Sequence, residues 1–185
     1  SHKEMPQPSE RLLGCQLWVN LPATKKMVPP TYRDISLTDI PVVADKATVR
    51  ILSGCYQGIR GALNGSHARV TYLDITLPAG ILWSYEEAHN NETLFIYLLE
   101  GSLFPDPEQR SIEDKGCAIL YSVSAPGERT HEPVVVKAGA EGARFLLLAA
   151  SPLREPVAWG GPIVMNTHEE LRESFEELRN GTFIK

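Results

Sequence analysis

Several absences narrow what this 185-residue sequence can do. It has only three cysteines, Cys15, Cys55 and Cys117, and no C-x-x-C pair, so neither a zinc ribbon nor a thioredoxin-type centre is indicated. Their odd number and wide spacing are typical of reduced thiols in a reducing compartment. Basic residues are not in excess, since 18 Lys and Arg face 23 Asp and Glu. With a formal charge of −5, the chain has no excess of basic residues that would indicate direct nucleic-acid binding.

Long apolar runs are also missing. The longest, residues 94–99 and 145–150, fall far short of the roughly 20 residues that a membrane helix needs. No basic and apolar leader opens the chain, so we expect no signal peptide, no membrane contact and a cytoplasmic or nuclear location. A G-x-S-x-G elbow, a P-loop and a dinucleotide fingerprint are absent as well.

Turn-forming residues are abundant and separate a series of short strand patterns. Gly and Pro number 14 each, which favours many short strands over a helical bundle. Branched, aromatic and alternating residues predict strands over 16–20, 47–52, 69–77, 94–99, 118–121, 133–137 and 144–149. The continuously apolar stretch 94–99 is typical of a strand buried on both faces. The series predicts an all-β sandwich, barrel or jelly roll with a core that includes Ile96, Tyr97, Leu98 and Leu147.

One helix is predicted near the C-terminus. Thr167 and Glu170 have the spacing of a capping box, and Asn180-Gly181 supplies a stop. Between them an apolar stripe at helical spacing is formed by Leu171, Phe175 and Leu178. We therefore expect a helix over residues 168–179, with a solvated face rich in Glu and Arg.

A histidine and a carboxylate lie two residues apart at the start of the chain. On a strand, the side chains of His2 and Glu4 would point to the same face, roughly 6.5–7 Å apart. An imidazole nitrogen and a carboxylate oxygen could then bind one ion. Mixed ligation with open positions suits non-haem Fe(II) better than a closed zinc site. The pattern is short, however, and Ser1-His2 is also what a cloning scar looks like.

Four ordered blocks across nearly the whole chain resemble the pirin family. The blocks are GCQLWVNLP at 14–22, Lys26-Met27 with Pro30 and Tyr32, PLREP at 152–156, and GPIVMNT at 161–167. Pirins are two-cupin proteins. The resemblance implies that residues 1–35 are the tail of a first, metal-binding cupin, 36–43 a linker and 44–185 a second cupin. The implied fold is a cupin-type β-sandwich, or jelly roll, with a short C-terminal α-helix.

The resemblance also implies a metal site. Pirins hold their metal in the first cupin with two histidines on an earlier strand and with the histidine and glutamate of an H-x-E-M-P segment. Residues 2–6, HKEMP, match that segment, so His2 and Glu4 are the implied ligands of Fe(II) or another divalent metal in the intact protein. The two earlier histidines have no counterpart in this chain. We therefore expect no tightly bound metal, and no activity, in the chain alone.

The second cupin retains little of a metal-binding pattern. Counting back from Gly101 places Leu94 where a cupin glutamate would stand, and of the two preceding histidine positions at most His89 is a histidine. His131 fits a later ligand position only if a loop insertion is allowed. Since the set is incomplete, we expect a structural cupin, with His89, Glu86 and Glu87 in a solvated loop.

Two functions follow from the resemblance. The first is an Fe(II)-dependent dioxygenase that cleaves flavonols of the quercetin type. The second is a metal-dependent nuclear cofactor that acts by binding a transcription factor. Turnover needs an open coordination position and an apolar cavity, whereas a regulator needs an exposed charged patch. Lys25-Lys26 is the basic cluster that could form such a patch, but it is small, and ordinary solvated lysines account for it better.

Overall fold

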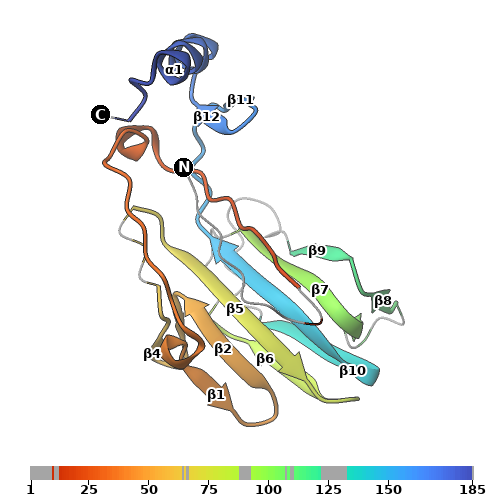
Figure 1. Ribbon diagram of the computed structural model, residues 1–185. Helices are drawn as coiled ribbons and strands as arrows, with labels where there is room; N and C mark the ends of the chain where they lie inside the picture. Colours follow the sequence, from red (N-terminus) through yellow and green to blue (C-terminus); the bar gives the residue numbers. More distant parts are fainter. Residues whose placement is uncertain are drawn as a thin grey trace.

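The computed structural model describes residues 10, 13–63, 65, 67–87, 93–106, 108, 111–121 and 133–184. Within them an antiparallel sheet folds around one core, and a helix stands apart from it (Figure 1). The sheet runs in the order β1-β2-β5-β10-β7-β8, with β6 joined to β10 and β9 joined to β7. The expected all-β fold with one C-terminal α-helix is confirmed.

The bounds of the elements follow the chain. The strands of the main sheet are β1 (Val42–Ala44), β2 (Thr48–Ser53), β5 (Val70–Leu77), β6 (Leu82–Tyr85), β7 (Thr93–Phe104), β8 (Glu113–Asp114), β9 (Ala118–Tyr121) and β10 (Val134–Ala150). Two small hairpins are β3 (Cys55–Tyr56) with β4 (Ile59–Arg60), and β11 (Ala158–Gly160) with β12 (Ile163–Met165). The helices are η1 (Ala23–Lys25), η2 (Leu37–Asp39) and α1 (His168–Asn180). None of the helices in the described ranges is long and apolar enough to cross a membrane.

The core is formed by alternate residues of the main strands. Ile96, Leu98 and Leu147 are fully buried, which confirms their predicted place in the core. The same prediction for Tyr97 is wrong, because its side chain is 36% exposed. Successive side chains of β7 point to opposite faces of the sheet, so the neighbours of Leu98 lie on the outer face. Residues 94–99 are thus fully buried on one face only.

The patterns predicted as two strands, 133–137 and 144–149, belong to the single long strand β10. Its first part pairs with β6 and its second part with β5, while β7 pairs along both. The stretch between them, AGAEGA, contains the glycines expected of a turn. It forms an irregularity in the strand instead, with a register shift between Ala138 and Ala143 and a φ of +82° at Gly142.

The outer face of the sheet is apolar in part and is covered by the N-terminal segment, which we define as residues 13–22. In Figure 1 this segment, drawn in red, runs along β7 and β10. Leu146 and Leu148 on β10 are buried but do not belong to the main core. Burial raises the pKa of Tyr72 on the paired strand β5, and the nearby Cys15 and Asp74 add to the rise. The sheet therefore has a second, smaller buried surface.

A charged pair also lies on this face. Arg144 donates from Nε and Nη2 to the two carboxylate oxygens of Asp74, at 3.0 and 2.8 Å. The Asp74 side chain is only 10% exposed, and the hydrogen bonds from Arg144 give both of its carboxylate oxygens a partner. They also raise the pKa of the Arg144 guanidinium, which stays charged.

The predicted strand at residues 16–20 is wrong. The segment has no regular secondary structure, although its sequence QLWVN has strong strand propensity. Among the described residues no strand lies beside it to exchange backbone hydrogen bonds, and a strand cannot form alone. Leu17, Trp18 and Val19 remain exposed.

The helix is confirmed within one residue of its predicted end. Thr167 Oγ1 accepts from the Glu170 N–H at 3.1 Å, and Glu170 Oε2 accepts from the Thr167 N–H at 2.9 Å, which completes the capping box. Leu171 and Phe175 pack against Gly160 of β11. Leu178 is 49% exposed, so its predicted place in the apolar stripe is wrong, and Ser174 is the buried residue instead. The short hairpin β11–β12 covers only the first turns of the helix.

We expect Thr167→Ala to destabilise α1 by about 1 kcal/mol, because the Glu170 N–H loses its acceptor. The helical band of the far-UV circular dichroism spectrum, followed during heating, measures the effect. Glu173→Ala is the matched control, because it removes a charge from an exposed position of the same helix and leaves the capping box intact. The control should stay within about 0.5 kcal/mol of the unmodified chain. Equal loss in both variants would mean that the cap contributes nothing specific.

Candidate functional site

The metal ligands predicted in the first residues cannot be placed. His2 and Glu4 lie outside the described residues, as do His89 and His131. Their predicted roles therefore stay predictions.

The interior of the sandwich is occupied by aromatic side chains. The Trp83 ring lies 6.2 Å from the rings of Tyr56 and Tyr85 and 5.7 Å from that of Phe145, and its Nε1 donates to Tyr56 Oη at 3.1 Å. Leu94, which stands at the cupin glutamate position, is 3% exposed and packs in this core. In the described ranges no group of three His, Cys, Asp or Glu side chains could hold a metal. The described interior thus does not fit a divalent ion, because it offers apolar and aromatic groups where a metal needs charged donors.

Glu86 and Glu87, which were both expected in a solvated loop, differ in how exposed they are. Glu86 is exposed, in keeping with that expectation. Glu87 is half-buried, and its Oε1 accepts a hydrogen bond from the backbone N–H of Gln57. This residue therefore ties the end of β6 to the turn between β3 and β4.

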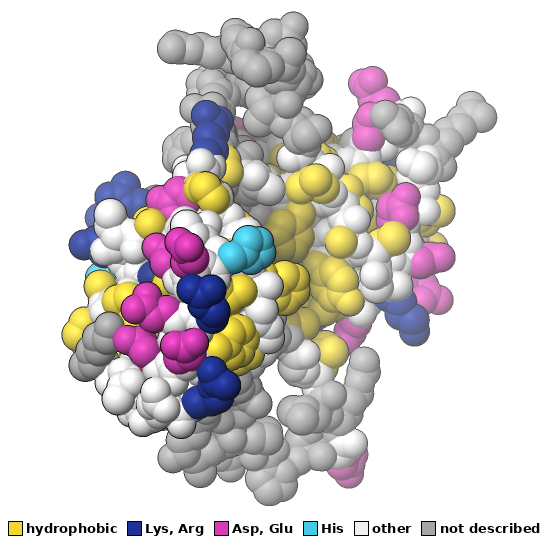
Figure 2. Space-filling model, turned by 90° about the horizontal axis from the view of Figure 1, so that it is seen from above, with side chains coloured by type: hydrophobic (Ala, Val, Ile, Leu, Met, Phe, Trp, Pro, Cys, Tyr) yellow, Lys and Arg dark blue, Asp and Glu magenta, His cyan; other side chains and the backbone are white. Residues whose placement is uncertain are grey.

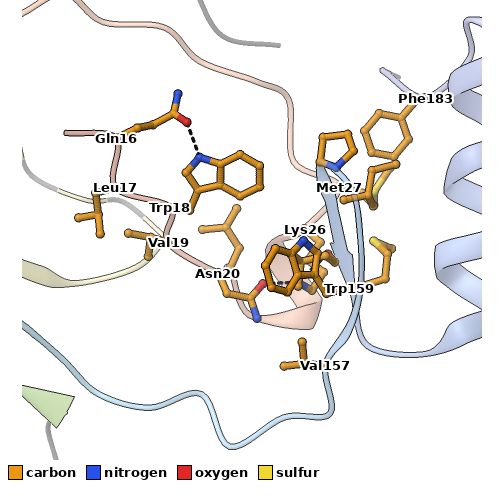
Figure 3. Close-up of a pocket in the computed structure, with 15 residues that line it drawn as sticks. Gln16, Leu17, Trp18, Val19, Asn20, Lys26, Met27, Val157, Trp159 and Phe183 are labelled. Carbon is orange, nitrogen blue, oxygen red and sulfur yellow. Dashed lines mark hydrogen bonds between the residues drawn. The ribbon is translucent and has the colours of Figure 1, made fainter. Parts of the chain in front are cut away.

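A groove of about 720 Å³ lies between the two ends of the chain (Figure 3). One wall comes from the N-terminal segment and the two residues that follow η1. The other comes from hairpin β11–β12, from Val157 just before it and from Phe183 after α1. The lining residues are Gln16, Leu17, Trp18, Val19, Asn20, Leu21, Lys26, Met27, Val157, Trp159, Pro162, Ile163, Val164, Met165 and Phe183. Blocks of sequence that lie far apart in the chain, 14–22 and 161–167, therefore meet at one place.

Lys26 joins the two walls of the groove. Its Nζ donates to Asn20 Oδ1 at 2.5 Å and to the carbonyl oxygen of Val164 at 3.0 Å. Burial lowers the pKa of Lys26, and the nearby carboxylates of Glu155 and Glu170 oppose that shift. The reading of Lys25-Lys26 as two solvated lysines is wrong for Lys26, which is half-buried, and holds for Lys25, which is exposed.

Two carboxylates continue the connection between the ends of the chain. Glu155 Oε2 accepts from the backbone N–H of Ala23 at 2.8 Å and from Asn166 Nδ2 at 3.1 Å. Glu170 Oε2 accepts from the backbone N–H of Asn166 at 3.0 Å. The sequence contains no local signal for the contacts of Ala23 with Glu155 and of Lys26 with Val164, whose partners are 132 and 138 residues apart.

Comparison with known proteins follows the same blocks. A family model described as "Pirin C-terminal cupin domain" matches residues 72–184. "Pirin" of Mus musculus is 36% identical over 182 residues, which is 97% of this chain and 60% of the mouse protein. "Pirin-like protein" of Caulobacter vibrioides is 34% identical over 186 residues, 98% of this chain and 63% of that protein. The chain thus spans about 60% of the length of the curated relatives it matches.

A solved structure supports the fold. The 1.88 Å crystal structure of quercetin 2,3-dioxygenase from Acinetobacter baumannii aligns with a TM-score of 0.74 and 30% identity. The alignment covers 90% of this chain and 55% of that one. The expected cupin-type fold with a C-terminal helix is confirmed by this likeness.

Proposed function

The chain belongs to the pirin family, and on that premise we propose that it forms the C-terminal part of an Fe(II)-dependent dioxygenase that cleaves flavonols of the quercetin type. One observation carries the proposal. The protein that matches over 90% of this chain at 30% identity is named a quercetin 2,3-dioxygenase. Because this chain corresponds to about half of that protein, the proposal concerns the intact two-cupin protein.

The division of the chain is part of the proposal. Residues 1–35 are assigned to the tail of a first cupin, 36–43 to a linker and 44–185 to the second cupin. The strand-like sequence at 16–20 supports this assignment, because its exposed apolar side chains Leu17, Trp18 and Val19 suit a strand of another sheet. The domain match, which begins at residue 72, lies wholly within the proposed second cupin.

The metal is assigned to the first cupin. His2 and Glu4 would hold it together with two histidines from the preceding part of the protein. When bound, Fe(II) supplies the one-electron chemistry with dioxygen that amino-acid side chains cannot supply. The second cupin, whose described interior is filled by Trp83, Phe145 and their neighbours, acts as a structural support.

The regulatory alternative has less support. It depended on an exposed basic patch at Lys25-Lys26. Lys26 instead donates two hydrogen bonds within the groove, so only one cation of the pair projects into solvent. A single exposed lysine is an ordinary surface feature and gives a partner little to recognise.

The test compares the intact protein with the 185-residue chain. In the intact protein, Glu4→Ala should contain no iron, as measured by elemental analysis. It should also no longer cleave quercetin in air, an activity followed as the decrease in quercetin absorbance. Glu10→Ala is the matched control, because it removes an exposed glutamate from the same region. The chain alone should contain no stoichiometric iron, since half of the proposed ligands and their scaffold are missing.

Two results would contradict the proposal. If intact Glu4→Ala retained iron and turnover, the assignment of Glu4 as a ligand would be wrong. If the chain alone bound iron that survived Glu4→Ala but disappeared in His89→Ala, the site would belong to the second cupin.

A further inference from the structure

Residues 151–184 leave the main sheet after β10 and form a unit of their own, which we call the C-terminal arm (Figure 1). Its two strands, β11 and β12, pair with each other and with none of the described strands of the main sheet. Hydrogen bonds connect the arm to the start of the chain: Glu155 accepts from the backbone N–H of Ala23, and the Val164 carbonyl accepts from Lys26. On the division proposed above, the two residues that it holds there belong to the first cupin. The arm is therefore bonded to the tail of one cupin although it follows the last strand of the other.

The arm has an apolar outer side. Val157 and Trp159 are 62% and 71% exposed, and Ala158 between them is buried, as the two-residue period of a strand requires. The polar atom of the Trp159 ring, Nε1, donates to the carbonyl oxygen of Gly161 at 2.8 Å, so the hairpin itself satisfies it. Figure 2 shows the charged side chains of α1 with hydrophobic side chains gathered beside them. Neighbouring large apolar side chains that face water indicate a surface that another part of a protein covers.

The N-terminal segment extends this apolar surface. Leu17 and Trp18 are also exposed, and both line the groove together with Val157 and Trp159 (Figure 3). Because the segment is assigned to a strand of the first cupin, the sheet of that cupin would continue beside the arm. The mouse relative extends beyond its match by roughly 120 residues, since the matched 182 residues are 60% of it, and such a length suffices for a domain. The first cupin is therefore the occupant that both position and size favour.

We propose that the first cupin binds the C-terminal arm, and that Val157 and Trp159 are buried beneath it in the intact protein. The chain then returns to the first cupin after it has completed the second, so the linker 36–43 is not the sole connection between the two. A second copy of the protein would compete for this surface with a domain of the same polypeptide, whose tether raises its local concentration. The inference rests on the proposed division into two cupins, but not on the proposed iron chemistry.

Thiol labelling of the intact protein tests the docking. Val157→Cys keeps a side chain of similar size and supplies a thiol that iodoacetamide can modify. In the native protein this thiol should react at least about tenfold more slowly than in urea, because labelling requires the arm to leave the first cupin. Val42→Cys is the matched control, since Val42 is 52% exposed on β1, at the opposite end of the molecule from the arm (Figure 1). Its native rate should lie within about threefold of its rate in urea. Mass spectrometry of peptides separates these thiols from the natural cysteines.

Two results would overturn the inference. If Val157→Cys reacted as fast as in urea while its circular dichroism stayed native, the arm would be exposed in the intact protein. If its protection increased with protein concentration, the cover would be a second copy. Iron content of the same samples keeps this test apart from the proposed function. An iron-free protein with a protected Val157→Cys thiol would contradict the metal site alone, and an iron-bound protein with a freely reacting thiol would contradict the docking alone.

Trp159→Ala gives an independent measure that needs no new thiol. In the intact protein it should lower the midpoint of thermal unfolding by about 5 °C or more, because a buried indole loses its packing. Val42→Ala, the control on β1, should shift the midpoint by about 2 °C or less. A shift for Trp159→Ala no larger than that of Val42→Ala would contradict the burial of Trp159 beneath the first cupin.

Discussion

Replacing Leu98 by alanine should lower the free energy of unfolding by about 2–5 kcal/mol. Leu98 has no exposed surface and lies opposite Phe145 in the register of β7 and β10. Its backbone is also fixed, since its N–H donates to the Cys117 carbonyl at 3.0 Å and its own carbonyl accepts from Gly116 at 2.8 Å. The site therefore cannot collapse around the missing atoms, and the cavity stays open. Urea unfolding monitored by tryptophan fluorescence measures the loss.

Tyr97→Ala is the control for this experiment. It removes a larger side chain from the next position of the same strand, but that side chain is 36% exposed on the outer face. Its cost should be clearly smaller than that of Leu98→Ala, because less surface leaves water in the folded state. If Tyr97→Ala proved the more damaging change, the assignment of inner and outer faces to β7 would have to be reversed.

Gly101→Ala should be at least as damaging, with an expected loss of about 3–5 kcal/mol. Gly101 has a φ of +73°, and a Cβ added there would overlap the carbonyl oxygen of Gly142 on the neighbouring strand. The clashing atom belongs to the residue just before Ala143, which pairs with Leu77 of β5 and with Gly101 itself, so relief of the clash requires β10 to shift against β7. The substitution therefore combines a strained backbone conformation with a steric conflict.

Gly116→Ala separates these two effects. Its φ of +89° imposes a similar backbone cost, but a Cβ at this position would meet only open space. We expect about 1–2 kcal/mol for this variant, the cost of a left-handed conformation alone. Thermal and urea unfolding of both variants give the comparison. Equal losses would show that β7 and β10 can separate at Gly101 and that close approach there contributes little.

The elements that could be predicted are those whose signals are local. The helix is an example: the three-residue spacing of Thr167 and Glu170 produces the capping box, and Gly181 adopts the left-handed conformation that ends the helix. The burial of Ile96 and Leu98 follows from the two-residue period of a strand. What failed is non-local. Whether Tyr97 is buried depends on what covers the other face of the sheet, and the sequence of β7 does not contain that information.

The same limit applies to the candidate sites. Propensity predicts a strand at 16–20, yet a strand also needs a neighbouring strand, and none of the described strands pairs with this stretch. Lys26 looks like a solvated lysine because its partners Asn20 and Val164 are brought together only by the tertiary fold. By contrast, that an apolar residue, Leu94, stands at the position of the cupin glutamate could be read from the sequence, and this residue is buried in the core. Single-residue chemistry is readable in sequence, whereas a groove built from both ends of a chain is not.

The apolar outer face of β10 has a consequence for how the protein reaches its native state. A sheet formed before the N-terminal segment had settled on it would present Leu146 and Leu148 to water, and transiently exposed apolar strands are where misassembly begins. Ribosomal synthesis proceeds from the N-terminus, so residues 13–22 exist before β10 emerges. The last long strand, β10, is therefore synthesised after the segment that covers its outer face. This order of elements along the chain reduces the time for which the apolar outer face is exposed, and so reduces aggregation.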